Sequence, residues 1–137
     1  MLSTPQQDRP VPLDLVIVRA NDFPGMLAFY RDVLGFQPVD EQPDPALYEP
    51  GRNWIAFETG GTRLELFARR SPQPVTTASP PPVVPAIRVV DLPAQVGRLK
   101  ALGVRFSREG EQAWGRYADL VDPEGNEINL YEDLRGG

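Results

Sequence analysis

Hydrophobic and polar residues alternate along residues 13–19, with β-branched side chains at several apolar positions, which is typical of a β-strand. Apolar residues then recur at helical spacing between Asp22, a suitable N-cap, and Gly35, which can end a helix. Three more strand patterns follow, at about 37–40, 53–58 and 62–68. The first half of the chain therefore predicts the element order βαβββ.

The same order of patterns returns in the second half of the chain. A β-branched strand at 85–90 leads to Asp91 as helix N-cap, and an apolar stripe continues to Gly103. Further strand patterns follow at 104–107, 116–121 and 127–131. The turn signal 122–125 (DPEG) separates the last two strands.

The two halves also match at fixed separations. Arg19 and Asp22 match Arg88 and Asp91 at an offset of 69 positions. Residues 61–67 (GTRLELF) match residues 125–131 (GNEINLY) at an offset of 64 positions. Self-similarity of this kind indicates two copies of one supersecondary unit.

We expect the repeat to form one compact domain from two modules, residues 13–70 and 84–132. Residues 71–83 are rich in proline and are expected to be an extended linker. Residues 1–12 are expected to be a flexible N-terminal tail, and residues 133–137 a C-terminal tail.

Composition narrows the possible chemistry. The 137 residues include no histidine and no cysteine, which excludes disulfides, Ser-His-Asp or Cys-His catalysis, and metal sites built on imidazole or thiolate. The net charge of −5 disfavours nucleic acids and anionic membranes as partners. Because no apolar run approaches the ~20 residues that span a bilayer and the N-terminal segment lacks a signal-peptide pattern, we expect a cytoplasmic location.

Two segments carry a family resemblance. Residues 29–36 (FYRDVLGF) and 122–126 (DPEGN) resemble the vicinal oxygen chelate superfamily, which includes glyoxalases, bleomycin-resistance proteins and extradiol dioxygenases, and the likeness covers about residues 13–132. The resemblance implies an α+β fold in which two βαβββ modules form a partly open eight-stranded barrel around a cavity, with the helices outside. It also implies a homodimer.

Metal-dependent members of this superfamily place ligands on the first and last strands of each module. Carried over by the resemblance, these positions are Leu15, Glu65, Val84 and Asn129. Leucine and valine offer no lone pair, and one carboxylate with one amide would hold a divalent cation weakly. We therefore expect neither a metal nor another cofactor.

The remaining cavity residues suggest a ligand site. Glu65 is either a general base, a carboxylate for a cationic ligand, or a residue in a salt bridge with Arg63 or with an arginine across the barrel. Resemblance to the fosfomycin-resistance branch places Asp119 inward and near Glu65. The residues expected to line the ligand site are Leu15, Ile17, Phe57, Glu65, Phe67, Val84, Trp114, Tyr117, Asp119, Asn129 and Tyr131.

The favoured function is metal-independent binding or sequestration of a small hydrophobic or cationic molecule in the barrel cavity. An amine-bearing aromatic compound would suit carboxylates among aromatic rings. The alternative is a lyase, isomerase or dioxygenase of the glyoxalase type that uses Glu65 as base or a weak metal site. Residues 40–52 are either a lid over the site or a surface loop.

Overall fold

The computed structural model describes residues 11–39, 54–74 and 81–135. The first module contains β1 (Leu15–Ala20), α1 (Phe23–Ala28), the π-helical turn η2 (Phe29–Val33), β2 (Gln37–Pro38), β3 (Trp54–Glu58) and β4 (Arg63–Ala68). The second contains β5 (Ala86–Arg88), α2 (Leu92–Ala101), β6 (Phe106–Gln112), β7 (Gly115–Val121) and β8 (Glu127–Asp133). The segment 40–52, considered above as a lid, lies outside the described residues. Residues 1–10, 75–80 and 136–137, which belong to the expected tails and linker, also lie outside them.

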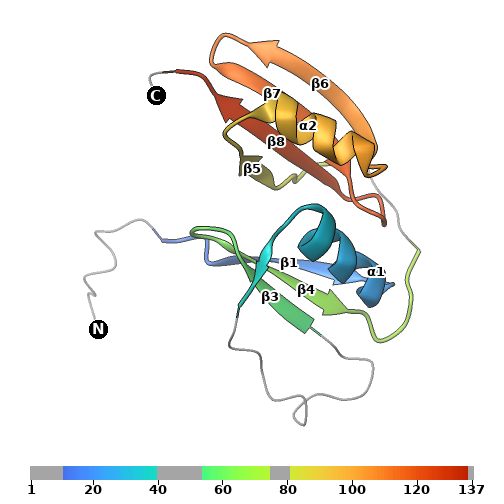
Figure 1. The fold of residues 1–137 in the computed structure, drawn as a ribbon. Helices are drawn as coiled ribbons and strands as arrows, with labels where there is room; N and C mark the ends of the chain where they lie inside the picture. The colour runs from blue at the N-terminus through green and yellow to red at the C-terminus, as the bar shows by residue number, and fades with distance from the viewer. Residues whose placement is uncertain (1–10, 40–53, 75–80, 136–137) are drawn as a thin grey trace, which may run out of the picture.

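The strands form two four-stranded sheets, in the orders β1-β4-β3-β2 and β5-β8-β7-β6 (Figure 1). In each sheet the first and last strands of the module pair in parallel, and the remaining neighbours are antiparallel. The prediction of an α+β fold with two βαβββ modules is confirmed. Within the described residues no strand of one sheet pairs with the other sheet, so the chain does not close a barrel by itself.

Both helices begin as the sequence predicts. The side chain of Asp22 accepts a hydrogen bond from the backbone N–H of Gly25 at 3.1 Å, and Asp91 accepts one from Ala94 at 3.2 Å. The first helix is α-helical only to Ala28, after which η2 continues it with a wider turn. In the part of the chain that is described, no helix is long and apolar enough to span a membrane.

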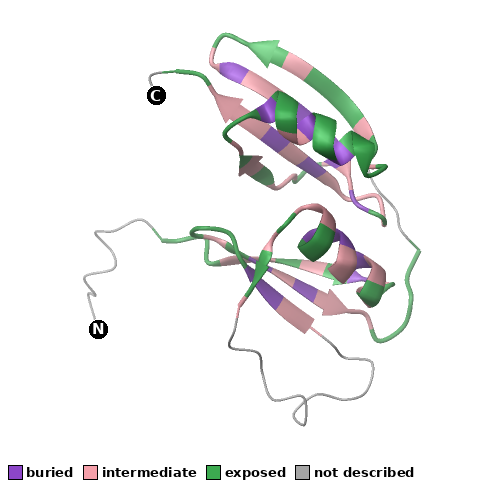
Figure 2. Ribbon diagram, in the orientation of Figure 1, coloured by how far each residue is buried: buried purple, intermediate pink, exposed green. Residues whose placement is uncertain are grey.

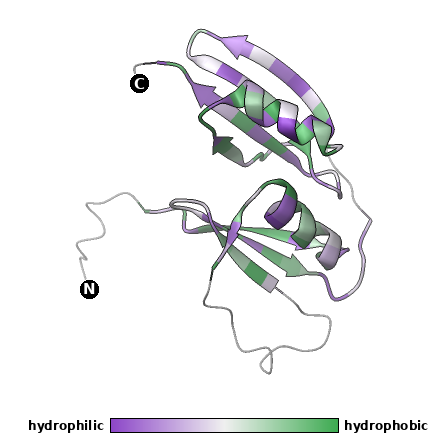
Figure 3. Ribbon diagram, in the orientation of Figure 1, coloured by the Kyte–Doolittle hydropathy of each residue, from purple (hydrophilic) through white to green (hydrophobic). Residues whose placement is uncertain are grey.

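Strand β6 extends well beyond the segment 104–107 that the pattern predicts. It lies at the edge of the second sheet and pairs only with β7 among the described strands. Its residues are mainly hydrophilic (Figure 3), as expected of an edge strand that is held by backbone hydrogen bonds and presents polar side chains. Periodicity in hydrophobic residues therefore gives little signal for it.

Each helix covers one face of its own sheet, and the buried residues gather there (Figure 2). In the first module Met26, Phe29 and Tyr30 form a cluster with Phe57, Leu64 and Leu66. In the second, Leu92, Val96 and Leu99 join Ala118, Leu120, Ile128 and Leu130 in the same cluster. The helix α1 lies on the side of the first sheet nearer the second module, so the opposite face of that sheet points away from it (Figure 1).

A buried carboxylate joins the two modules. Asp122, 1% exposed, accepts a hydrogen bond from the hydroxyl of Tyr30 at 2.7 Å. It also accepts from the backbone N–H groups of Glu124 and Asn126 and from the Asn126 side chain, at 2.8, 3.0 and 2.8 Å. Burial, together with the negative charge of Asp122, raises the pKa of Tyr30 far above its usual range, so the hydroxyl remains a donor.

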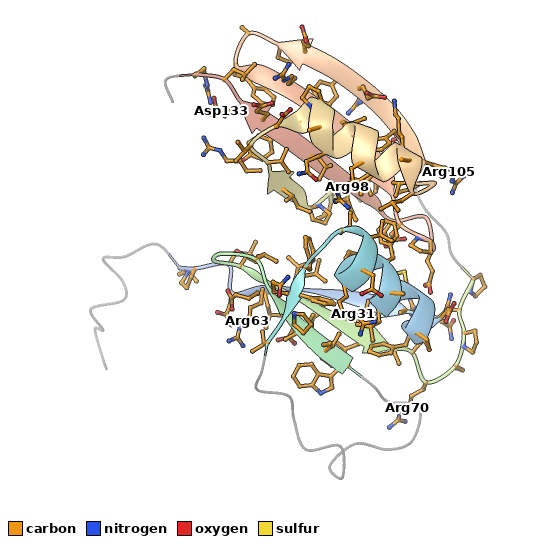
Figure 4. The ribbon with its side chains drawn as sticks, in the orientation of Figure 1. Arg31, Arg63, Arg70, Arg98, Arg105 and Asp133 are labelled. Atoms are coloured by element: carbon orange, nitrogen blue, oxygen red, sulfur yellow. The ribbon has the colours of Figure 1, made fainter. Side chains whose placement is uncertain are left out.

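The turn 122–126, which contains Asp122, also binds the start of α1 directly. The carboxylate of Glu124 accepts hydrogen bonds from the backbone N–H groups of Asn21 and Asp22, at 2.9 and 2.8 Å. A further link comes from α2, where Arg98 donates to the backbone oxygen of Val33 at 3.0 Å and points toward the first module (Figure 4). The turn 122–126 therefore fixes how the modules sit relative to each other.

Candidate functional site

Alternation along the strands divides each sheet into a helix-covered face and an open face. In the first sheet, Leu64 and Leu66 of β4 point into the core, so Arg63, Glu65 and Phe67 point to the open face. The strand register then places further residues on this face: Leu15, Ile17 and Arg19 from β1, and Trp54 and Ala56 from β3. The predicted site residues Leu15, Ile17, Glu65 and Phe67 therefore share one uncovered surface.

Glu65 lies in the middle of this face, between apolar neighbours on the adjacent strands. Its neighbours across the strands are Ile17 on β1 and Ala56 on β3. Phe67, on the same strand, stacks on Trp54 with ring centroids 5.5 Å apart and an interplanar angle of 8°. The side chain of Glu65 is thus a carboxylate bordered by hydrocarbon and aromatic groups.

The expected salt bridge of Glu65 with Arg63 is not present. Arg63 instead pairs with Glu58 at 3.4 Å and lies on the side of the sheet away from α1 (Figure 4). Among the described residues, none forms a hydrogen bond or an ion pair with Glu65. Within the described part of the chain, a ligand would therefore displace no protein partner from this carboxylate.

The open face of the first sheet continues into a hollow of about 380 Å³. Its lining residues are Ile17, Arg19, Phe67, Ala68, Arg69, Arg70, Ser71 and Gln73. Ile17 and Phe67 connect it to the surroundings of Glu65. The three arginines were not among the predicted site residues, because arginine is frequent throughout this chain and its strand-end positions carry no periodic signal.

The positions carried over from metal-dependent relatives offer only two side-chain donors, those of Glu65 and Asn129. On β1 the residue directly opposite Glu65 is Ile17 rather than Leu15. On β5 the residue directly opposite Asn129 is Ala86, and Val84 precedes this strand. Glu65 and Asn129 lie on different sheets. Within residues 11–39, 54–74 and 81–135, no three acidic side chains gather in a way that could hold a metal. The donor chemistry does not fit the metal that the resemblance implies.

In the second sheet, Tyr117 and Asp119 of β7 share the open face with Tyr131 and Asn129 of β8. Asp119 and Glu65 belong to different sheets, and their expected closeness across the barrel cavity stays a prediction. The Asp119 carboxylate accepts hydrogen bonds from Asn129 at 2.6 Å and from Arg108 at 3.1 Å. Both of its oxygens are already occupied, so it offers little to a cationic ligand.

Phe57 is not on an open face, contrary to expectation. It is fully buried, at 0% exposed, and its ring lies 6.0 Å from that of Phe36 and 6.4 Å from that of Tyr30. In the register of β3 with β4, Phe57 is opposite the core residue Leu64. Strand parity therefore assigns it to the helix-covered face.

Trp114 lies beside the second sheet's open face. Its ring meets that of Tyr131 edge to face, with centroids 5.9 Å apart. It lines a shallow hollow of about 370 Å³ together with Arg108, Gln112, Tyr117 and Asn129. Arg108 and Gln112 were missed in the sequence because they belong to the unpredicted part of β6.

Known structures share this architecture. SMU.1112c matches with a TM-score of 0.75 and 22% identity, over 90% of this chain and 100% of that one. Lactoylglutathione lyase from Agrobacterium tumefaciens matches with a TM-score of 0.64 and 22% identity, over 90% and 94% of the two chains. TnmS3, an antibiotic binding protein from Streptomyces sp. CB03234, matches with a TM-score of 0.65 and 25% identity, over 90% and 97%.

No match was found among curated proteins. The family model for the Glyoxalase/Bleomycin resistance protein/Dioxygenase superfamily, however, matches residues 13–130, which include both βαβββ modules. Sequence pattern, topology and family model agree, and the chain belongs to this superfamily.

Proposed function

We propose that this protein binds a small molecule with an apolar, aromatic part and a cationic group on the open face around Glu65, without a metal ion. The observation that carries the proposal is the carboxylate of Glu65, which lacks a partner among the described residues and is bordered by Ile17 and Phe67. An amine would gain a charge-assisted hydrogen bond there, while its apolar part covers the neighbouring rings. The antibiotic binding protein TnmS3 supports a binding role by its fold and 25% identity.

The proposal is tested by calorimetric titration of the purified chain with 1-naphthylmethylamine and with its neutral counterpart 1-naphthylmethanol. We expect the amine to bind at least about tenfold more tightly, since only the amine forms a charge-assisted contact. Equal affinities would contradict the role of the carboxylate. Preference for a matched anion would instead favour the arginines of the first hollow, Arg19 and Arg69.

An enzymatic role would use the same carboxylate differently. In a metal-independent lyase or isomerase, Glu65 would act as general base and remove a proton from a carbon acid bound on this face. Only catalytic turnover of a bound compound would distinguish this role from binding alone, so each compound that binds is also to be tested for chemical change by mass spectrometry.

A cytoplasmic homodimer stays a prediction. The barrel implied by the family needs two sheet faces opposite each other, and the open face of the first sheet points away from the second module (Figure 1). A second copy would supply the missing face and would cover side chains such as Ile17, which is 45% exposed. Native mass spectrometry of the purified protein would detect the expected dimer.

A further inference from the structure

The open face of the second sheet holds an arginine that is fixed from two directions. The Nε–H of Arg108 donates to an Asp119 oxygen at 3.1 Å, and Nη2 forms an ion pair with the same oxygen at 3.0 Å. The guanidinium carbon also lies 5.4 Å from the centroid of the Tyr117 ring. The side chain of Asp119 is only 3% exposed, whereas that of Arg108 is 65% exposed. One edge of the guanidinium is therefore anchored and the rest faces solvent.

The exposed part of this guanidinium retains donors for a ligand. A guanidinium has five N–H donors, of which Asp119 accepts the one on Nε, while Nη2 forms an ion pair with the same oxygen. No other acceptor for Arg108 occurs among the described residues. Because the planar fork is already oriented, a planar oxyanion that binds to it loses little side-chain entropy in Arg108.

The surroundings of Arg108 provide an aromatic surface. Trp114 and Tyr117 line the same hollow of about 370 Å³, with the amides of Gln112 and Asn129 at its border. An aromatic ring that carries a carboxylate would stack on these side chains while its oxygens meet the guanidinium. The combination suits an aromatic carboxylate better than an aliphatic anion.

Nearby acidic residues are directed elsewhere. Glu109 pairs with Lys100 at 2.8 Å and alternates to the helix-covered face of the sheet. Asp133 pairs with Arg135 at 3.0 Å, and hydrogen bonds from Arg135 lower the pKa of Asp133 to about 2. Asp119 itself is neutralised by Arg108. Glu127, which alternation places on the open face beside Asn129, does not line the hollow, so a carboxylate that enters it would meet mainly compensated charges.

We propose that Arg108 anchors the carboxylate of an aromatic ligand in a second binding site, on the open face of the second sheet. Glu65 lies on the other sheet and is not among the residues that line this hollow. A purely structural role, in which Arg108 only neutralises the buried Asp119, would require neither the exposed donors nor the adjoining aromatic hollow.

The test is titration of the full chain with 2-naphthoate and with its neutral counterpart 2-naphthamide, followed by calorimetry and by the NMR signal of the Trp114 indole N–H. We expect the carboxylate to bind about tenfold more tightly than the amide, and Arg108→Gln to remove this preference. Arg105→Gln is the matched control, since Arg105 is exposed and lies at the opposite end of the second module from Asp133 (Figure 4).

Arg108→Gln leaves the buried carboxylate of Asp119 without its cation, so folding requires a separate check. The double variant Arg108→Gln/Asp119→Asn removes both charges together, and we expect it to fold but to bind the two compounds equally. The proposal is overturned if 2-naphthoate and 2-naphthamide bind the wild type equally, or if neither binds. It is also overturned if the folded double variant still prefers 2-naphthoate to 2-naphthamide. The same holds if Arg105→Gln removes this preference as completely as Arg108→Gln does.

Discussion

Replacing Asp122 by alanine is expected to lower the free energy of unfolding by about 3–5 kcal/mol. The carboxylate is 1% exposed and accepts from the Tyr30 hydroxyl, from two backbone N–H groups and from the Asn126 side chain. Removing it leaves several of these donors without a protein acceptor at the junction of the modules. In a chain of 137 residues, such a loss would reduce Tm by roughly 10 °C or more.

Denaturant unfolding of the wild type and of Asp122→Ala measures this effect. Asp14→Ala is the control, because Asp14 is exposed and its side chain makes no hydrogen bond or ion pair among the described residues. We expect the control to change stability by no more than about 0.5 kcal/mol. If Asp122→Ala were as mild as the control, the hydrogen-bonded turn would not be what joins the modules.

Replacing Glu65 by glutamine is expected to weaken the binding of 1-naphthylmethylamine by roughly ten- to a hundredfold. The substitution keeps the size of the side chain but removes the charge that faces Ile17 and Ala56. Folding should be nearly unaffected, because within the described part of the chain no hydrogen bond or ion pair is lost. Calorimetric titration of both proteins measures the change.

Glu58→Gln provides a matched control for Glu65→Gln. It removes the same charge from the neighbouring strand β3, where Glu58 pairs with Arg63 and is exposed. We expect the affinity of Glu58→Gln for the amine to stay within about twofold of the wild type, since the charge of an exposed, already paired side chain is largely screened. A comparable loss in the two variants would mean that overall charge, rather than the position of Glu65, determines binding.

The sequence predicts the fold well because the fold depends on signals that repeat. The two matching patterns, with N-caps at Asp22 and Asp91, indicate both modules and their element order. Parity along β4 also predicts which side chains share a face with Glu65, since this strand alternates regularly between core and open positions. Local periodicity and capping are thus enough to assign elements and faces within a strand.

The parts of the site that were missed depend on pairing between strands. Phe57 lies in β3, and the register of β3 with β4 turns it toward the core; a shift by one residue would reverse that assignment. Arg108 and Gln112 belong to a polar edge strand that carries no hydrophobic period. The bonds of Asp119 depend on which residue of β6 lies opposite, across a register shift between Phe106 and Arg108. A single sequence does not contain this information.

The claim that ligand binding needs no metal is tested most directly by titrating the purified protein with 1-naphthylmethylamine after dialysis against a chelator, and again with added manganese or zinc. Because Leu15 and Val84 occupy two of the positions that hold ligands in metal-dependent relatives, we predict dissociation constants that agree within about twofold. Binding that disappears after chelation and returns with the added ion would contradict the proposed function.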